Sequence, residues 1–93
     1  MNQDFAVFSS IKLSAAKKEP LYVQLYTGLH QLIQAGQLSP GYALPPVRKF
    51  AAWLGINPGT VVNAYHELEK NGFLLKELIL NRKEKLNTII KER

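Results

Sequence analysis

The chain has 93 residues, a size that predicts one domain with one small core, because so short a chain buries only about 60–65% of its unfolded surface. It contains no cysteine, which excludes disulfides and thiolate metal sites. The net charge of +5 is uneven: residues 20–75 carry three basic and two acidic side chains, whereas residues 76–93 carry six basic and three acidic ones. Charge alone therefore does not locate a nucleic-acid site.

Several function classes have no residue pattern to support them. No apolar run approaches the ~20 residues of a membrane span, and the N-terminus lacks a signal-peptide pattern, so we expect a cytoplasmic protein with no membrane partner. His30 and His66 lie far apart without metal-ligand spacing, and we expect both at the surface and no metal. We find no nucleophile motif, phosphate-binding glycine loop or paired carboxylates, so we expect no enzyme and no cofactor.

Residues 1–19 have little periodicity. Phe5 and Val7 alternate with other residues, which permits a short edge strand, and an N-terminal arm is the alternative that we favour. A helix then begins after Pro20, where a missing N–H costs nothing, and Gly36 offers its stop. Its apolar positions follow helical spacing: Leu21, Leu25, Leu29, Leu32 and Ile33.

Two further helices follow around a three-residue break at residues 55–57. The first begins near Pro46 and ends at Gly55, with an inward face at i, i+3, i+4 and i+7: Val47, Phe50, Ala51 and Leu54. The second begins with Asn57 as N-cap and Pro58 as first helical residue, and repeats the same spacing at Val61, Ala64, Tyr65 and Leu68. Residues 20–73 therefore predict a helix-turn-helix DNA-binding domain.

The outward face of the last of these helices is where base recognition is expected. Asn63 could contact adenine, Val62 could pack on a thymine methyl group, and Thr60 could reach a phosphate or a base. Arg48, beside Lys49 on the preceding helix, could hold a phosphate or a guanine with its fork. The predicted DNA-binding set is Arg48, Lys49, Asn57, Gly59, Thr60, Val62, Asn63 and His66. The alternative is that these polar residues only cap and solvate the two helices.

A string of short motifs in residues 20–73 resembles the GntR winged helix-turn-helix domain, with a leaning toward its YtrA-like and MocR-like branches. The motifs are Leu21-Tyr22, Gln24-Leu25, Gly36 to Gly41, Leu44-Pro45 with Arg48, Leu54 to Asn57, Thr60-Val61, and Leu68 with Gly72. The resemblance implies a bacterial, dimeric transcription regulator that binds a two-fold symmetric operator in double-stranded DNA. It also implies that Arg48 and Thr60 occupy DNA-contacting positions.

The chain departs from that family in two places. Pro58, Val62 and Asn63 stand where the family often has basic residues, so we expect fewer ionic groove contacts. After Gly72 the family forms a hairpin wing with a glycine-rich tip, but here no glycine follows Gly72. We therefore predict a mainly α fold: a three-helix winged-helix-type helix-turn-helix with an extra C-terminal helix and little or no β wing.

Residues 74–93 are assigned to this amphipathic C-terminal helix. Its predicted apolar seam pairs two chains in a homodimer through Leu75, Ile79, Leu86 and Ile89. Packing of the helix on its own domain is one alternative, and a hairpin with strands at residues 73–80 and 85–90 is another. Because the segment is too short for an effector domain, we expect no small-molecule effector.

Two functions are consistent with these observations. The first is a sequence-specific transcription regulator, with repression by occlusion as the expected mode, that inserts the helix starting near Asn57 into the major groove. The second is a diverged dimerisation or protein-interaction module with weak DNA binding, which a missing wing and a weakly charged recognition helix would favour.

Overall fold

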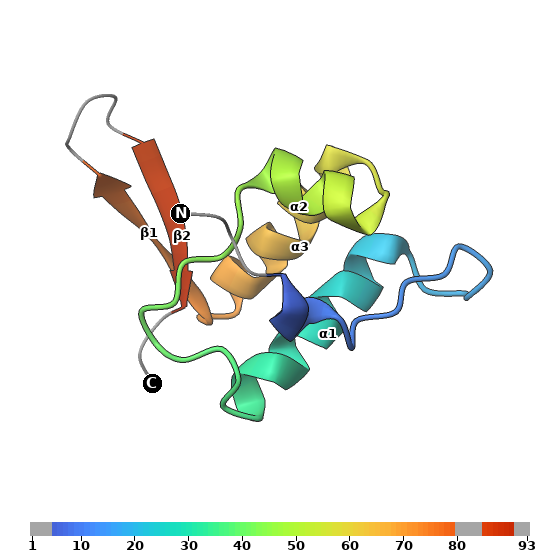
Figure 1. The fold of residues 1–93 in the computed structure, drawn as a ribbon, viewed down its shortest axis with the longest axis horizontal. Helices are drawn as coiled ribbons and strands as arrows, with labels where there is room; N and C mark the ends of the chain where they lie inside the picture. Colours follow the sequence, from blue (N-terminus) through green and yellow to red (C-terminus); the bar gives the residue numbers. More distant parts are fainter. Residues whose placement is uncertain (1–4, 80–84, 91–93) are drawn as a thin grey trace.

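In the described residues, the fold consists of three α-helices, a short 3-10 helix and a two-stranded hairpin (Figure 1). The structure, a computed structural model, describes the backbone of residues 5–79 and 85–90 and the side chains of residues 5–73. The elements are the 3-10 helix η1 (Ala6–Phe8), α1 (Leu21–Gln34), α2 (Val47–Leu54), α3 (Pro58–Lys70), β1 (Leu74–Ile79) and β2 (Lys85–Ile90). The mainly α, three-helix winged-helix class predicted from the sequence is confirmed. Within the described ranges, no helix is long and apolar enough to cross a membrane.

The turn between α2 and α3 is fixed by backbone hydrogen bonds around Gly55. The N–H of Ile56 donates to the carbonyl of Ala51 at 3.0 Å, and the N–H of Gly55 donates to that of Ala52 at 3.3 Å. This pair of bonds is the Schellman arrangement, which requires a left-handed residue, and Gly55 has φ +73°. The glycine predicted to end α2 therefore also sets the angle at which α3 leaves it.

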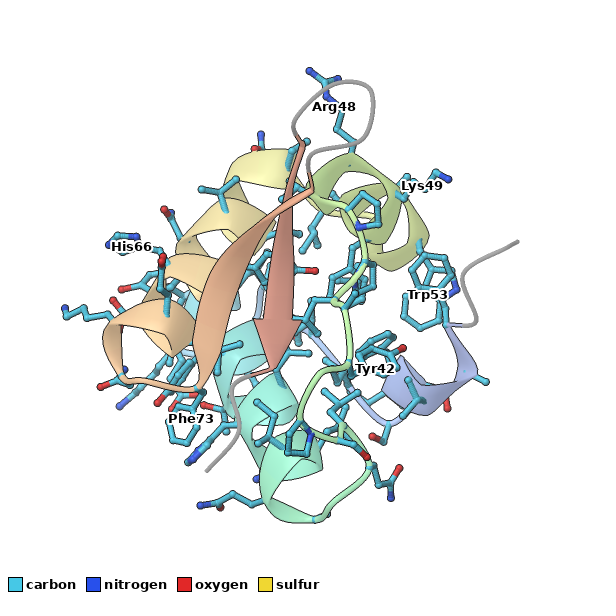
Figure 2. All side chains as sticks on the ribbon, turned by 90° about the vertical axis from the view of Figure 1, so that its left-hand side faces the viewer. Tyr42, Arg48, Lys49, Trp53, His66 and Phe73 are labelled. Carbon is cyan, nitrogen blue, oxygen red and sulfur yellow. The ribbon has the colours of Figure 1, made fainter. Side chains whose placement is uncertain are left out.

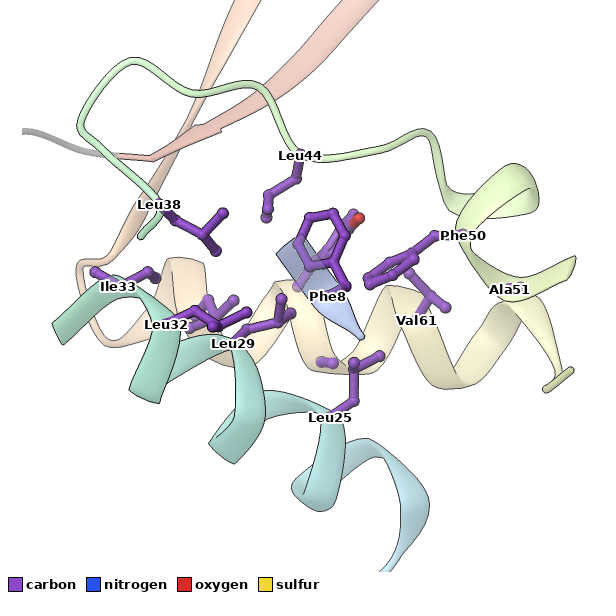
Figure 3. Close-up of a cluster of buried hydrophobic side chains, with 13 residues drawn as sticks. Phe8, Leu25, Leu29, Leu32, Ile33, Leu38, Leu44, Phe50, Ala51 and Val61 are labelled. Atoms are coloured by element: carbon purple, nitrogen blue, oxygen red, sulfur yellow. The ribbon is translucent and has the colours of Figure 1, made fainter. Parts of the chain in front are cut away.

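The core lies between the inward faces of the three helices (Figure 3). Phe8 and Phe50 are fully buried and meet with ring centroids 4.9 Å apart. The other buried hydrophobic residues are Leu25, Leu29, Leu32, Ile33, Leu38, Leu44, Ala51, Val61, Ala64, Tyr65 and Leu68. The inward faces predicted for all three helices thus supply most of the core.

The N-terminal segment differs from its prediction. Where an edge strand was permitted, Val7 lies in η1 and Phe5 directly precedes it, and Phe8 enters the core. Gln24 of α1 holds the segment that follows: its Oε1 accepts from the Ser14 N–H at 2.9 Å, and its Nε2 donates to the carbonyls of Ser14 and Glu19 at 2.9 and 2.8 Å. The described part of the N-terminal segment is therefore anchored on the helices at Phe8, Ser14 and Glu19 and is not a free arm.

The predicted C-terminal helix is wrong, because β1 and β2 pair as an antiparallel hairpin over most of the same residues. The register places Leu75 opposite Ile89, Leu78 opposite Leu86, and Ile79 opposite Lys85. A strand alternates its faces every residue, so Leu75, Ile79, Leu86 and Ile89 do not form the one helical seam on which the predicted dimer contact rested.

Residue type explains the error. The Leu, Lys and Glu content of this segment suits a helix, and apolar residues at spacings of four and seven suggested a helical stripe. Residues 88–90 are Thr-Ile-Ile, however, and β-branched side chains favour a strand over a helix. Gly72, with φ +85°, ends α3 and turns the chain into β1. The hairpin that the sequence offered as an alternative is the observed structure.

Tyr65 joins α3 to the segment before α2. Its hydroxyl donates to the Pro45 carbonyl at 2.7 Å in a buried position, and burial raises the pKa of Tyr65, so the phenol keeps the proton that it donates. Because Pro45 lies three residues before Arg48, this bond fixes the start of α2 relative to α3.

Replacing Tyr65 with phenylalanine is expected to destabilise the domain by about 1–3 kcal/mol, because the buried Pro45 carbonyl would lose its partner. Urea unfolding followed by circular dichroism measures the change. Tyr22→Phe is the matched control, since Tyr22 is only half-buried, and it should change stability much less. Equal losses of stability in the two variants would show that the hydrogen bond from Tyr65 to Pro45 does not stabilise the domain.

Candidate nucleic-acid interface

The two faces of α3 differ sharply in exposure. Val61, Ala64 and Leu68 are fully buried, whereas Val62 is 50% exposed and Asn63 is also exposed. Gly59 and His66 are exposed as well, and Thr60 is half-buried. The residues predicted to face a duplex from α3 therefore lie on its solvent side, and the half-burial of Thr60 limits how far it can reach outward.

Asn57 has a defined structural task at the start of α3. Its backbone is extended, and its Oδ1 accepts a hydrogen bond from the Gly59 N–H at 2.7 Å. This is an N-cap, which satisfies one of the free N–H groups of a helix start. The Oδ1 of Asn57 therefore serves as a helix cap. The residues of α3 that are left for base readout are Val62, Asn63 and His66.

Replacing Asn57 with alanine is expected to cost about 0.5–2 kcal/mol of stability through loss of the cap. Asn57→Asp keeps an acceptor for the Gly59 N–H and should retain stability. Thermal unfolding of both variants separates the two outcomes. If alanine and aspartate were equally destabilising, the cap would not be what Asn57 contributes.

Arg48 and Lys49 lie in the first turn of α2, and both are exposed (Figure 2). In that view they occupy one end of the molecule, and His66 of α3 lies on the opposite side of the hairpin. Within the described part of the chain neither side chain takes part in an ion pair, and the ion pair found there joins Lys70 to Glu67 at 3.7 Å. Both cations are therefore available to an anionic ligand.

The hairpin carries basic residues that were predicted to lie in a C-terminal helix. Lys76 belongs to β1 and Lys85 to β2. Arg82, Lys83 and Glu84 stand between the two strands in the sequence but lie outside the described residues. Two of the basic residues that seemed remote from the helix-turn-helix, Lys76 and Lys85, thus lie on strands that follow α3 directly. The β-branched residues 88–90 were the signal in the sequence that could have revealed a strand there.

The chain combines a helix-turn-helix, an exposed outer face on α3 and a hairpin that follows α3. A family model matches nearly all of the residues that form these elements. The model described as "Bacterial regulatory proteins, gntR family" matches residues 21–88, which include all three α-helices, β1 and β2 as far as Thr88. The chain belongs to the GntR family. The helix-turn-helix of this family is a DNA-binding fold and not the fold of an enzyme.

Individual relatives agree with this assignment. The chain is 36% identical over 64 residues to the HTH-type transcriptional repressor YtrA of Bacillus subtilis, covering 69% of this chain and 49% of that protein. It is 41% identical over 59 residues to the HTH-type transcriptional regulator Rv1152 of Mycobacterium tuberculosis, covering 63% and 49%. This GntR chain thus spans about half the length of these curated relatives.

A solved structure shows the same fold. YtrA from Sulfolobus acidocaldarius, a GntR-family transcription factor, superposes with a TM-score of 0.75 at 34% identity, covering 89% of this chain and 81% of that one. The resemblance predicted from the motifs of residues 20–73 is therefore confirmed. The expected absence of a wing is not, because the family match runs through the hairpin.

Proposed function

We propose that this GntR chain is a sequence-specific regulator of transcription that reads duplex DNA by inserting α3 into the major groove. The observation that carries the proposal is the outer face of α3, where Val62, Asn63 and His66 are exposed within the first three turns of a helix whose other face is buried. The N-terminal part of such a helix is what reaches base edges.

The exposed side chains suit direct readout. An asparagine amide matches the donor and acceptor pair that adenine shows in the major groove, and a valine packs on the thymine methyl group. Arg48 and Lys49 of α2 would hold phosphates beside this helix, and their position relative to α3 is set by the bond from Tyr65 to Pro45. Base reading from α3 and phosphate anchoring from α2 together define one protein orientation on the duplex.

The hairpin supplies charge that the helices lack. Residues 20–75 have one more basic than acidic side chain, so phosphate attraction by the helix-turn-helix alone is weak. Residues 76–85 add Lys76, Arg82, Lys83 and Lys85 against Glu77 and Glu84. A wing placed against the adjacent groove would bring these cations to the backbone.

We further propose that two chains occupy a two-fold symmetric operator, with their α3 helices about 34 Å apart, and repress by occlusion. One α3 reaches too few base pairs to single out one site in a genome, and a second copy doubles the site read. Such a regulator would act in the cytoplasm, where bacterial DNA lies. The name of the Bacillus relative, a transcriptional repressor, supports the direction of regulation.

An interaction module with weak DNA binding is the second candidate. The uncharged outer face of α3 favours it, because Val62 and Asn63 provide no phosphate attraction. The expected absence of a wing was the other main argument for an interaction module, and the observed hairpin removes that argument. DNA affinity separates the two candidates.

Selection from a pool of genomic duplex fragments tests the proposal. The chain is incubated with the pool at low and at physiological salt, and the retained fragments are sequenced. We expect enrichment of a two-fold symmetric sequence that persists at physiological salt. Retention that disappears with salt and enriches no sequence would favour the interaction module.

A further inference from the structure

His30 lies between two aromatic rings at the base of the hairpin. Tyr26, one turn earlier on α1, stacks on it with centroids 5.7 Å apart and an interplanar angle of 14°. The Phe73 ring meets its imidazole at 4.6 Å and 53°. His30 was expected at the surface, yet it is half-buried, and its Nε2 is buried with no hydrogen-bond partner among the residues whose side chains are described.

Phe73 is the residue through which α3 passes into β1. Its N–H donates to the Leu68 carbonyl at 2.8 Å, which closes α3, and β1 begins at the next residue. Its half-buried side chain packs against the hydrophobic core. Figure 2 shows Phe73 at the opposite end of the molecule from Arg48, where the chain leaves α3. The orientation of this residue therefore sets the direction in which the hairpin starts.

A two-stranded hairpin has little stability of its own, so its placement depends on where it is attached. Two of the attachments seen here are the end of α3, which contacts β1, and the ring contact from α1 to Phe73. Since α1 also packs along α3, a ring held between α1 and residue 73 ties the hairpin to the same frame that holds the recognition helix.

We propose that Tyr26, His30 and Phe73 form a wing clamp, an aromatic stack that positions the hairpin so that it and α3 contact one duplex together. His30 is a positioning residue in this arrangement and touches no DNA. The proposal rests on the proposed function, since it assigns the stack a part in DNA binding. It predicts that His30 acts on affinity through the basic residues of the hairpin and not through α3.

Two variants of His30 show whether its contribution to duplex affinity comes from the packing of its ring or from hydrogen bonding by its imidazole. His30→Ala removes the middle ring and should lower the affinity for the selected duplex by about tenfold, within the range of coupling between contacting residues. His30→Phe keeps a ring between Tyr26 and Phe73 and should restore binding. Leu13→Ala is the stability control, because Leu13 packs on the core from the N-terminal segment and lies outside the stack.

A double-mutant cycle then asks whether His30 acts through the wing. Arg82→Ala with Lys83→Ala is made in the unmodified chain and in His30→Ala, and all four affinities for the selected duplex are compared. If the clamp positions the wing, removing these charges should cost much less in His30→Ala than in the unmodified chain. Independent, multiplicative losses would overturn the clamp.

Hydrogen exchange of the free chain gives a readout that needs no DNA. His30→Ala should speed amide exchange in residues 74–79 and 85–90 while α1 to α3 keep their protection, whereas Leu13→Ala should not single out the hairpin. Unchanged hairpin exchange overturns the clamp while leaving the proposed function intact. If the unmodified chain binds no site specifically, the proposed function fails, and the clamp's part in DNA binding fails with it, whatever exchange shows.

Discussion

Replacing Phe8 with alanine is expected to lower the free energy of unfolding by about 3–5 kcal/mol, the usual cost of emptying a buried phenylalanine site. Phe8 is fully buried, and its ring meets those of Phe50 at 4.9 Å and Tyr42 at 6.4 Å. A small domain has a total stability of about 5–15 kcal/mol, so this loss would remove much of it. The N-terminal segment would then be part of the folding unit and not an appendage.

Chemical denaturation followed by circular dichroism measures this loss. Lys12→Ala is the control within the same segment, because Lys12 is exposed and its truncation should change stability little. The chain has a single tryptophan, Trp53, which stacks on Phe5 at 5.2 Å, so its fluorescence reports whether the segment stays docked. A Phe8→Ala change no larger than that of Lys12→Ala would mean that the segment contributes nothing to the fold.

Replacing Arg48 with alanine is expected to weaken binding to the selected duplex by about 10- to 100-fold, the effect of losing a charge-assisted hydrogen-bonded contact to a phosphate. The fork of Arg48 is exposed on the first turn of α2 and has no ion-pair partner in the described part of the chain, so none of the described side chains competes with DNA for it. For the same reason its removal should leave the unfolding transition unchanged.

Two further variants define what Arg48 contributes. Arg48→Lys keeps the charge without the fork, so it should recover only part of the affinity if the contact is bidentate. Lys70→Ala removes an exposed cation that already pairs with Glu67 at the far end of α3, and it should have little effect on affinity. Salt titration adds a second measure, because loss of one phosphate contact lowers the slope of log affinity against log salt by about 0.9. A normal affinity for Arg48→Ala would contradict its assignment.

The helices were predictable because their ends and inward faces are coded locally. Gly55 and Asn57 supply a C-terminal stop and an N-cap two residues apart, and the structure uses both in those roles. The inward spacing from Val47 to Leu54 needed no knowledge of the tertiary structure, since helical period alone defines a face.

The hairpin was mispredicted because local composition and tertiary pairing conflict there. Leucine, lysine and glutamate favour a helix in isolation, whereas β1 and β2 stabilise each other only once they are paired, and the β-branched residues 88–90 were the one short local signal for a strand. The absence of glycine after Gly72 was also weighed too heavily. A glycine-rich tip is one way to join two strands, and its absence did not prevent the pairing of residues 74–79 with 85–90.

Long-range contacts account for the other structural features that the sequence did not predict. The bond from Tyr65 to Pro45 spans twenty residues, and the bonds from Gln24 to Ser14 span ten, so neither follows from sequence spacing. Phe8 lay in a segment without clear period, and its burial depends on a gap that only the assembled helices create. The candidate interface was predictable as a set of exposed residues, while the cap role of Asn57 and the half-burial of Thr60 required the structure.

The central claim is that the outer face of α3 reads base sequence. The most direct test compares the affinity of the chain for the selected duplex with its affinity for a scrambled duplex of the same composition, at physiological salt, in the unmodified chain and in Asn63→Ala. We expect the unmodified chain to prefer the selected duplex by at least about 10³-fold, the lower end for specific regulators. Asn63→Ala should lose much of that preference while keeping its affinity for the scrambled duplex. Equal affinity of the unmodified chain for both duplexes would contradict the account.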